Sequence, residues 1–225
     1  MTSARPAVLF DVDGTLVDSN YLHVYAWIKA FHAEDVPVEA WRIHRCIGMD
    51  GGTLLQTLAG DTDDDGRDRL KERHTTFYRE SAHLLTPLPG ARELLRRVAD
   101  LGLQVVLATS APEDELSLLR DVLDCDDVVS EVTSSQDVDT AKPQPDIVDV
   151  ALERAGVTKD AAVFVGDAVW DCEAARRAEV TSIGVLSGGV SRGELSEAGA
   201  AAVFENAAEL LAELDSTPIG TLASG

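Results

Sequence analysis

The chain is poor in cysteine, in aromatic residues and in positive charge, and it has no long apolar run. Its three cysteines are scattered over 225 residues. Such a set fits neither a disulfide framework nor a zinc site, so we expect free thiols in a reducing cytoplasm. No run approaches the roughly 18 apolar residues that a membrane span needs. The start, MTSARPAVLF, is too short in apolar residues for a signal peptide, and we expect a cytoplasmic protein.

Positive charge is scarce: 19 lysines and arginines stand against 40 aspartates and glutamates, a formal net charge of −21. Such a surface repels nucleic acid and anionic membranes, so we expect neither as a partner. It also repels anionic substrates, so any anion site needs positive charge of its own. The length suits one core domain with a smaller inserted or appended one.

Short β-like runs alternate with amphipathic stretches through most of the chain. This alternation predicts an α/β fold, a doubly wound, Rossmann-like parallel sheet with helices on both faces. The apolar run VVLA, residues 105–108, is typical of a strand buried on both sides. The expected strands are residues 7–10, 103–108, 128–129, 161–165, 181–185 and 202–204, and the expected helices are 91–101, 113–123, 146–155, 172–178 and 206–214.

One segment breaks the alternation. Helical patterns at residues 21–33, 51–59 and 67–82 follow each other without a convincing strand. They predict an all-helical domain inserted after the first strand, with links near residues 15–20 and 84–90. The expected division is a core domain of residues 1–16 and 87–215, a helical domain of residues 17–86 and a small, polar, disordered tail of residues 216–225.

Carboxylates follow two of the expected strands. Asp11 and Asp13 come directly after the first strand, and Asp167 and Asp171 come after the fourth. Ligands of a doubly wound sheet bind at the carboxyl ends of its strands. Like charges this close resist burial unless a positive group lies between them. Oxygen ligands in modest number suit Mg²⁺, so we predict a magnesium site here. Helix and turn capping is the alternative for Asp13, for Asp18 in the same turn and for Asp171.

An anion site is expected beside the metal. Thr109 and Ser110 follow the second strand, and Lys142 lies in AKPQPD after the third. Their hydroxyls and ammonium are the groups left to hold an anion at the same edge of the sheet. The alternatives are that Ser110 caps the next helix and that Lys142 is a solvated surface lysine.

Four motifs in order resemble the haloacid dehalogenase superfamily of phosphohydrolases over nearly the whole chain. They are DVDGT, the apolar strand that ends at Thr109, Lys142 before a proline, and GDAVWD. The resemblance implies that the helical insertion is the family's α-helical cap. HVYAW at 23–27, HRCIGM at 44–49 and KPQPD at 142–146 resemble the branch with β-phosphoglucomutase, sugar-phosphate phosphatases and phosphoglycolate phosphatase.

The resemblance also implies roles for the matching residues. Asp11 would be the nucleophile that becomes an aspartyl phosphate. Asp13 would protonate the leaving oxygen, then activate water, and lend its backbone carbonyl to Mg²⁺. Thr109 and Lys142 would hold the nonbridging phosphate oxygens, with backbone amides near Ser110. Asp167 would ligate the metal through its side chain, and Asp171 would ligate it or orient the site.

Two residues of the expected cap are candidates for substrate binding. Arg45 is expected to face the cleft and recognise a distal anionic group, and His23 lies in a segment that resembles an active-site lining. A structural role is the alternative for the histidine. The acidic stretch 61–72 matches a calcium-loop pattern, but Arg67 and Arg69 oppose a cation there. We favour a solvated loop that starts a cap helix.

These features predict a Mg²⁺-dependent phosphomonoester hydrolase of a small metabolite, with a sugar phosphate or a phosphoglycolate-like acid as its substrate. The expected partner is this small phosphate ester, and the expected state is a monomer or homodimer. A β-phosphoglucomutase needs the same residues and is the alternative. A haloacid dehalogenase is disfavoured by Asp13 and Asp167. A non-catalytic phosphometabolite-binding module gains nothing from crowded carboxylates.

Overall fold

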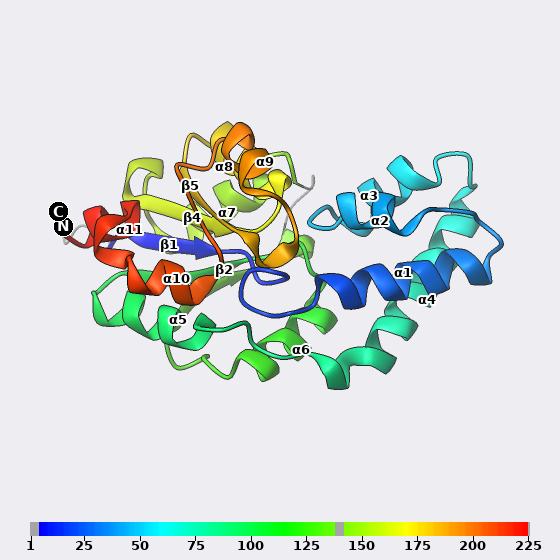
Figure 1. Ribbon diagram of the computed structural model, residues 1–225, viewed down its shortest axis with the longest axis horizontal. Helices are drawn as coiled ribbons and strands as arrows, with labels where there is room; N and C mark the ends of the chain where they lie inside the picture. Colours follow the sequence, from blue (N-terminus) through cyan, green and yellow to red (C-terminus); the bar gives the residue numbers. More distant parts are fainter. Residues whose placement is uncertain (1–4, 138–141, 225) are drawn as a thin grey trace.

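The computed structural model describes residues 5–137 and 142–224. Within them, six parallel strands form one sheet in the order β3-β2-β1-β4-β5-β6 (Figure 1). The doubly wound α/β fold predicted from the sequence is confirmed, although the third strand is longer than residues 128–129. The strands are β1 (Ala7–Phe10), β2 (Gln104–Ala108), β3 (Val129–Thr133), β4 (Ala162–Gly166), β5 (Thr181–Val185) and β6 (Ala202–Phe204).

The helices fall into two groups, one between β1 and β2 and one interleaved with the later strands. Helices α2 and α9 were not expected from the sequence. The first group is α1 (Asn20–Ala33), α2 (Ala40–Arg45), α3 (Gly51–Leu58), α4 (Asp64–Ser81) and α5 (Ala91–Asp100). The second is α6 (Glu113–Leu123), α7 (Asp146–Ala155), α8 (Val169–Arg177), α9 (Arg192–Ala198), α10 (Ala207–Ala212) and α11 (Pro218–Ser224).

Helices cover both faces of the sheet. Val8 and Phe10 of β1 pack into a core with residues of α5, α6 and α10, whereas Ala7 and Leu9 pack on the other face with residues of α7 and α8. Successive side chains of a strand point to opposite faces. Helices thus cover both faces of β1, and all four of its residues are fully buried. This burial on both sides explains why the strand is apolar throughout.

Helices α1 to α4 form a separate layer beyond the carboxyl ends of the strands (Figure 1). They have an apolar core of their own, in which Trp27 and Phe31 of α1 pack with Leu55 and Leu70. The prediction of an all-helical cap inserted after the first strand is confirmed. The stretch 61–72 forms the start of α4, as expected. Asp63 caps this helix: its carboxylate accepts the Gly66 N–H at 2.8 Å.

The expectation of a disordered tail is wrong for the described residues up to 224. Pro218 begins α11, a position that its fixed φ favours. Ile219 of this helix is fully buried in the core cluster to which α5 and α10 also contribute residues, and Leu222 packs against the same cluster. A few apolar side chains at helical spacing were thus enough to order a short, otherwise small and polar segment. None of the helices in the described part combines the length and the hydropathy that a membrane-spanning helix needs.

Candidate active site

The predicted site residues meet where the order of the sheet reverses. Strand β1 lies between β2 and β4, so the chain winds to one side first and then to the other. Asp11 follows β1 and Asp167 follows β4, and the Asp11 N–H donates to the Val165 carbonyl at 2.9 Å. Such switch points are where doubly wound sheets bind their ligands. The topology therefore places the carboxylates of two distant segments side by side.

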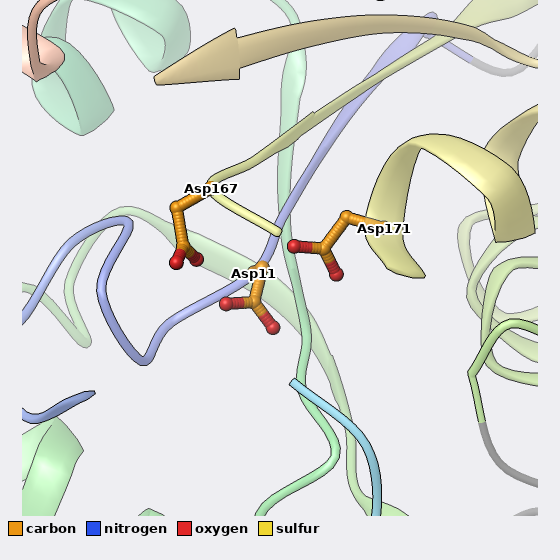
Figure 2. Close-up of side chains that lie close together, drawn as sticks. All are labelled: Asp11, Asp167 and Asp171. Carbon is orange, nitrogen blue, oxygen red and sulfur yellow. The ribbon is translucent and has the colours of Figure 1, made fainter. Parts of the chain in front are cut away.

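Three buried carboxylates converge at this point. Asp11, Asp167 and Asp171 each offer an oxygen within 4.8 Å of the other two (Figure 2). Burial raises the pKa of Asp11 well above its ordinary value, and neighbouring carboxylates add to this while Lys142 opposes it. Burial, with the charge of Asp171, raises the pKa of Asp167 to about 7. The cluster therefore carries more negative charge than its protein surroundings balance.

The donor set fits a hard divalent cation. Oxygens on opposite sides of a Mg²⁺ ion lie about 4.2 Å apart, since each Mg–O distance is about 2.1 Å. The three carboxylate oxygens lie within 4.8 Å of one another, close to this spacing. Three protein ligands leave coordination positions for the water molecules that Mg²⁺ usually retains. A bound cation also favours the ionised form of each acid, the form that burial alone disfavours. The residues present thus fit the metal that the sequence predicts.

The carboxylate of Asp167 is fixed from several sides. It accepts a hydrogen bond from the Thr15 hydroxyl at 2.9 Å and another from the Asn20 side-chain amide at 2.8 Å. Two glycines pack closely against it. A Cβ at Gly188 would lie 1.6 Å from its Oδ2, and one at Gly14, whose φ is +73°, would lie 2.6 Å from the same oxygen. Only glycine leaves room for this carboxylate at both positions.

We expect Gly188→Ala to weaken metal binding about 10- to 100-fold, the range found when groups that orient a metal ligand are altered. The added methyl group would overlap Asp167 and displace its carboxylate. The measurement is calorimetric titration of Mg²⁺ into each protein. Gly193→Ala is the matched control, because nothing lies within 4 Å of a Cβ there. Equal Mg²⁺ affinities in both variants would contradict the prediction.

Lys142 is an integral part of the cluster. Its side chain is fully buried, and its Nζ lies 2.6 Å from Asp11 Oδ1 and 2.6 Å from Asp171 Oδ1. Burial alone would lower the pKa of this lysine, but the two carboxylates outweigh it and raise the pKa, so the ammonium stays charged. The Asp171 carboxylate also accepts the Ala168 N–H at 3.0 Å, at the start of α8. The alternative of a solvated surface lysine does not hold.

Asp13 is not one of the three clustered carboxylates. Its Oδ1 accepts the Ser19 hydroxyl at 2.5 Å and lies 3.3 Å from His23 Nε2. Burial raises the pKa of Asp13, but the hydrogen bonds from His23 and Ser19 outweigh burial and hold it below its ordinary value. The two acids of DVDGT thus have different surroundings, one beside an ammonium and two carboxylates and the other beside an imidazole.

Comparison with known proteins places the chain. Residues 8–185, more than half of its length, match the family model of the haloacid dehalogenase-like hydrolases. The chain belongs to this family. It is 30% identical over 214 residues to a phosphoglycolate phosphatase of Rhodospirillum rubrum, covering 91% of this chain and 88% of that protein. It is 31% identical to a phosphorylated carbohydrates phosphatase of Thermotoga maritima over 203 residues, 88% of this chain and 94% of that protein.

Solved structures agree with the family. A hydrolase from Pseudomonas syringae is 40% identical, with a TM-score of 0.90 over 94% of this chain and 99% of that one. A β-phosphoglucomutase from Clostridium difficile has the same fold, with a TM-score of 0.84 and 19% identity over 98% of this chain and 100% of that one. The prediction that the chain is a hydrolase of this family is confirmed.

The cavity of this haloacid dehalogenase-like hydrolase has a volume of about 840 Å³ and lies between the sheet edge and the cap. Of the residues that the sequence singled out, it is lined by Asp11, Asp13, His23, Thr109, Ser110 and Lys142. From the cap, Gly48, Met49, Lys71 and His74 also line it. Residues of the sheet edge and of the cap therefore line one cavity.

Thr109 and Ser110 differ in their contacts. The Thr109 hydroxyl oxygen accepts the Ala111 N–H at 3.0 Å, so its own hydrogen is free to be donated. The Ser110 hydroxyl does not cap α6, whose first turn follows Pro112 without a side-chain cap. It lies 3.5 Å from the Gly48 carbonyl of the cap instead.

The expectation that Arg45 faces the cleft is wrong. Arg45 is not among the residues that line the cavity, and its guanidinium pairs with Glu194 of α9 at 2.6 Å. The hydrogen bonds that Glu194 accepts from Ser191 and from Arg45 lower its pKa to about 2. Arg45 thus joins the cap to the outer surface of the core. Lys71 of α4, which the sequence did not single out, lines the cavity.

Sequence reasoning missed several side chains that fix the predicted residues. Thr15, Ser19 and Asn20 lie within six residues after DVDG, and they donate hydrogen bonds to the carboxylates of Asp13 and Asp167. Small polar residues between a catalytic motif and a helix were a usable signal. His74 and Tyr78, which contact His23 from α4, lie far along the chain and had no such signal.

Proposed function

We propose that this chain is a Mg²⁺-dependent phosphomonoester hydrolase of a small metabolite that works through an aspartyl phosphate. The observation that carries the proposal is the buried ammonium of Lys142, 2.6 Å from Asp11 and within a cluster of three carboxylates. Nucleophile, fixed positive charge and cation ligands meet at one point of a cavity large enough for a sugar phosphate. The names of the relatives from Rhodospirillum rubrum and Thermotoga maritima support a phosphatase.

In this mechanism Asp11 attacks phosphorus, and the ester oxygen leaves. Lys142 has three N–H donors; one donates to Asp11, and the ammonium also forms an ion pair with Asp171. An N–H that Asp11 does not take is available to a nonbridging oxygen of the phosphate. The Thr109 hydroxyl donates to another, since its oxygen already accepts a backbone N–H. Positioning and neutralising the spreading charge is the main effect in phosphoryl transfer.

Asp11, Asp167 and Asp171, with the backbone carbonyl of Asp13, would hold the metal. When bound, Mg²⁺ supplies the positive charge that lets a phosphate dianion approach these carboxylates. Asp13 takes a proton from His23, whose Nε2 lies 3.3 Å away, gives it to the leaving oxygen and then takes one from the attacking water. The hydrogen bond with His23 keeps the Asp13 carboxyl beside the cavity during both steps.

The cap closes over the substrate in this proposal. We place its boundaries at residues 17 and 86, where the two linking segments run side by side. The Asp18 N–H donates to the Thr86 carbonyl at 2.9 Å, and the Leu88 N–H donates to the Leu16 carbonyl at 2.9 Å. These short paired segments act as the hinge, and closure excludes water from the phosphate.

The test is release of inorganic phosphate from a panel of sugar phosphates and phosphorylated small acids. We expect turnover with Mg²⁺, loss of at least about 100-fold in EDTA because the carboxylate cluster then repels the substrate, and recovery when Mg²⁺ is restored. Turnover that survives chelation would contradict the metal assignment. Isomerisation of a sugar phosphate that depends on a bisphosphate, without phosphate release, would indicate the mutase instead.

A further inference from the structure

A row of buried polar side chains leads away from Asp13 through the cap. His23 Nε2 lies 3.3 Å from Asp13 Oδ1, and His23 Nδ1 lies 3.1 Å from His74 Nε2. His74 Nδ1 in turn lies 3.9 Å from Glu115 Oε1. His74 is 7% exposed and Glu115 is 4% exposed. The mechanism above uses neither of these two residues.

This row crosses between the two parts of the molecule twice. Asp13 and Glu115 belong to the core, after β1 and in α6, whereas His23 and His74 belong to α1 and α4 of the cap. The first two contacts are of hydrogen-bond length, but the distance between His74 and Glu115 is about 1 Å too long. A small movement of the cap toward α6 would complete the row. Its continuity therefore depends on the position of the cap.

Aromatic neighbours fix the planes of both imidazoles. His23 stacks on Tyr78, with ring centroids 4.0 Å apart and planes 10° from parallel. His74 stacks on Trp27 at 4.2 Å and 20°. Stacked rings in a packed site do not turn freely. Both rings therefore keep their orientation, with His74 Nδ1 facing Glu115, and the hydrogen positions on the nitrogens decide which of them donate.

Glu115 faces Nδ1 of His74 and can therefore set which nitrogen of that imidazole carries the hydrogen. Burial lowers the pKa of His74 well below its ordinary value, so the ring is neutral and has one N–H donor. Burial raises the pKa of Glu115 to about 7. A neutral imidazole donates through one nitrogen and accepts through the other, so the group at Nδ1 sets what Nε2 offers to His23. The hydrogen position on His74 Nε2 in turn sets whether His23 donates to Asp13 or accepts from it.

We propose that Glu115 is a positioning residue that acts on Asp13 through His74 and His23 when the cap closes. The proposal rests on the proposed function, in which Asp13 protonates the leaving oxygen. A competing reading is that Glu115 only stabilises α6, where a carboxylate in the first turn is favourable. Glu115 lines the cavity, but in neither reading does it contact the reacting atoms. The two readings differ in how the loss of Glu115 affects different substrates and in whether that loss depends on His74.

The experiment compares kcat/KM for an alkyl phosphate ester with that for p-nitrophenyl phosphate, whose leaving group needs little protonation. In Glu115→Leu we expect a fall of about tenfold or more for the alkyl ester and of less than about threefold for the aryl ester. Glu115→Gln keeps a hydrogen-bonding end of the same size, and we expect it to recover most of the alkyl-ester activity. Glu113→Gln, at an exposed site in the same helical turn, is the control and should match the unaltered chain.

A double-mutant cycle tests whether Glu115 acts through His74. His74→Phe keeps a ring against Trp27 but removes both nitrogens, so adding Glu115→Leu to it should cost no further activity. Equal losses for the two esters in Glu115→Leu, or additive losses in the cycle, would overturn the inference while leaving the phosphatase in place. If the unaltered chain releases no phosphate from either ester, the proposed function fails and the inference fails with it.

Discussion

Asp11→Asn is expected to abolish phosphate release, lowering kcat by at least about four orders of magnitude. An amide of the same shape fits the site, but it does not attack phosphorus to form an acyl phosphate. The fold should survive, because the change removes one of three like charges buried within 4.8 Å of each other. The measurement is phosphate release under saturating Mg²⁺, with the thermal unfolding midpoint recorded for each protein.

Asp18→Asn is the matched control for this variant. Asp18 lies seven positions along the chain, and only its backbone takes part in the hinge pairing. Its side chain is exposed, so the change should leave kcat within about twofold, as for most surface substitutions. The unaltered chain, quenched in acid during turnover, should carry a phosphoryl group on the peptide that contains Asp11. Asp11→Asn should carry none. Measurable turnover in this variant, or a phosphoryl group on another residue, would refute the nucleophile assignment.

The parts of the site that the sequence predicted are those with local or topological signals. Asp11 and Asp13 sit in one turn after an apolar strand, and Gly14 in the same turn has the positive φ that glycine favours. Asp167 and Lys142 are far away in sequence, but each follows a strand that alternation with helices identifies. Parallel strands bring their carboxyl ends to one edge, so no knowledge of side-chain packing was needed.

Contacts across the cap could not be predicted in this way. His74 and Glu115 lie inside helices, in patterns that equally suit a surface or a core, and His74 is 51 positions from its partner His23. Arg45 was misplaced because its partner Glu194 belongs to α9, a helix that the sequence pattern did not reveal. The way a helical cap docks on its sheet depends on such long-range pairs, and so does the choice of substrate.

The two acids of DVDGT show how position within one turn separates chemical roles. Asp11 lies beside Lys142 and the acidic cluster, where burial favours a bound cation over free charge. Asp13 lies beside His23, a group that can accept or release a proton near neutral pH. An apolar strand delivers both to the edge of the sheet, and Gly14 turns the chain so that the second acid faces the cap.

Asp13→Asn is expected to lower kcat/KM for alkyl phosphate esters by about 10²- to 10⁴-fold, the contribution of general acid–base catalysis. Its side-chain carbonyl still accepts the hydrogen bonds from Ser19 and His23, so the geometry of the loop is retained. The amide has no proton to give to an alkoxide leaving group. p-Nitrophenyl phosphate, with its acidic phenol, should therefore lose much less in the first step.

The second step should slow for every substrate, because the amide also cannot take a proton from the attacking water. Stopped-flow measurement with p-nitrophenyl phosphate should then show a burst of one nitrophenolate per active site, followed by slow turnover as the aspartyl phosphate persists. Asp18→Asn again serves as the exposed control from the same loop. If Asp13→Asn lost both esters equally and gave no burst, the acid–base role would belong to another residue.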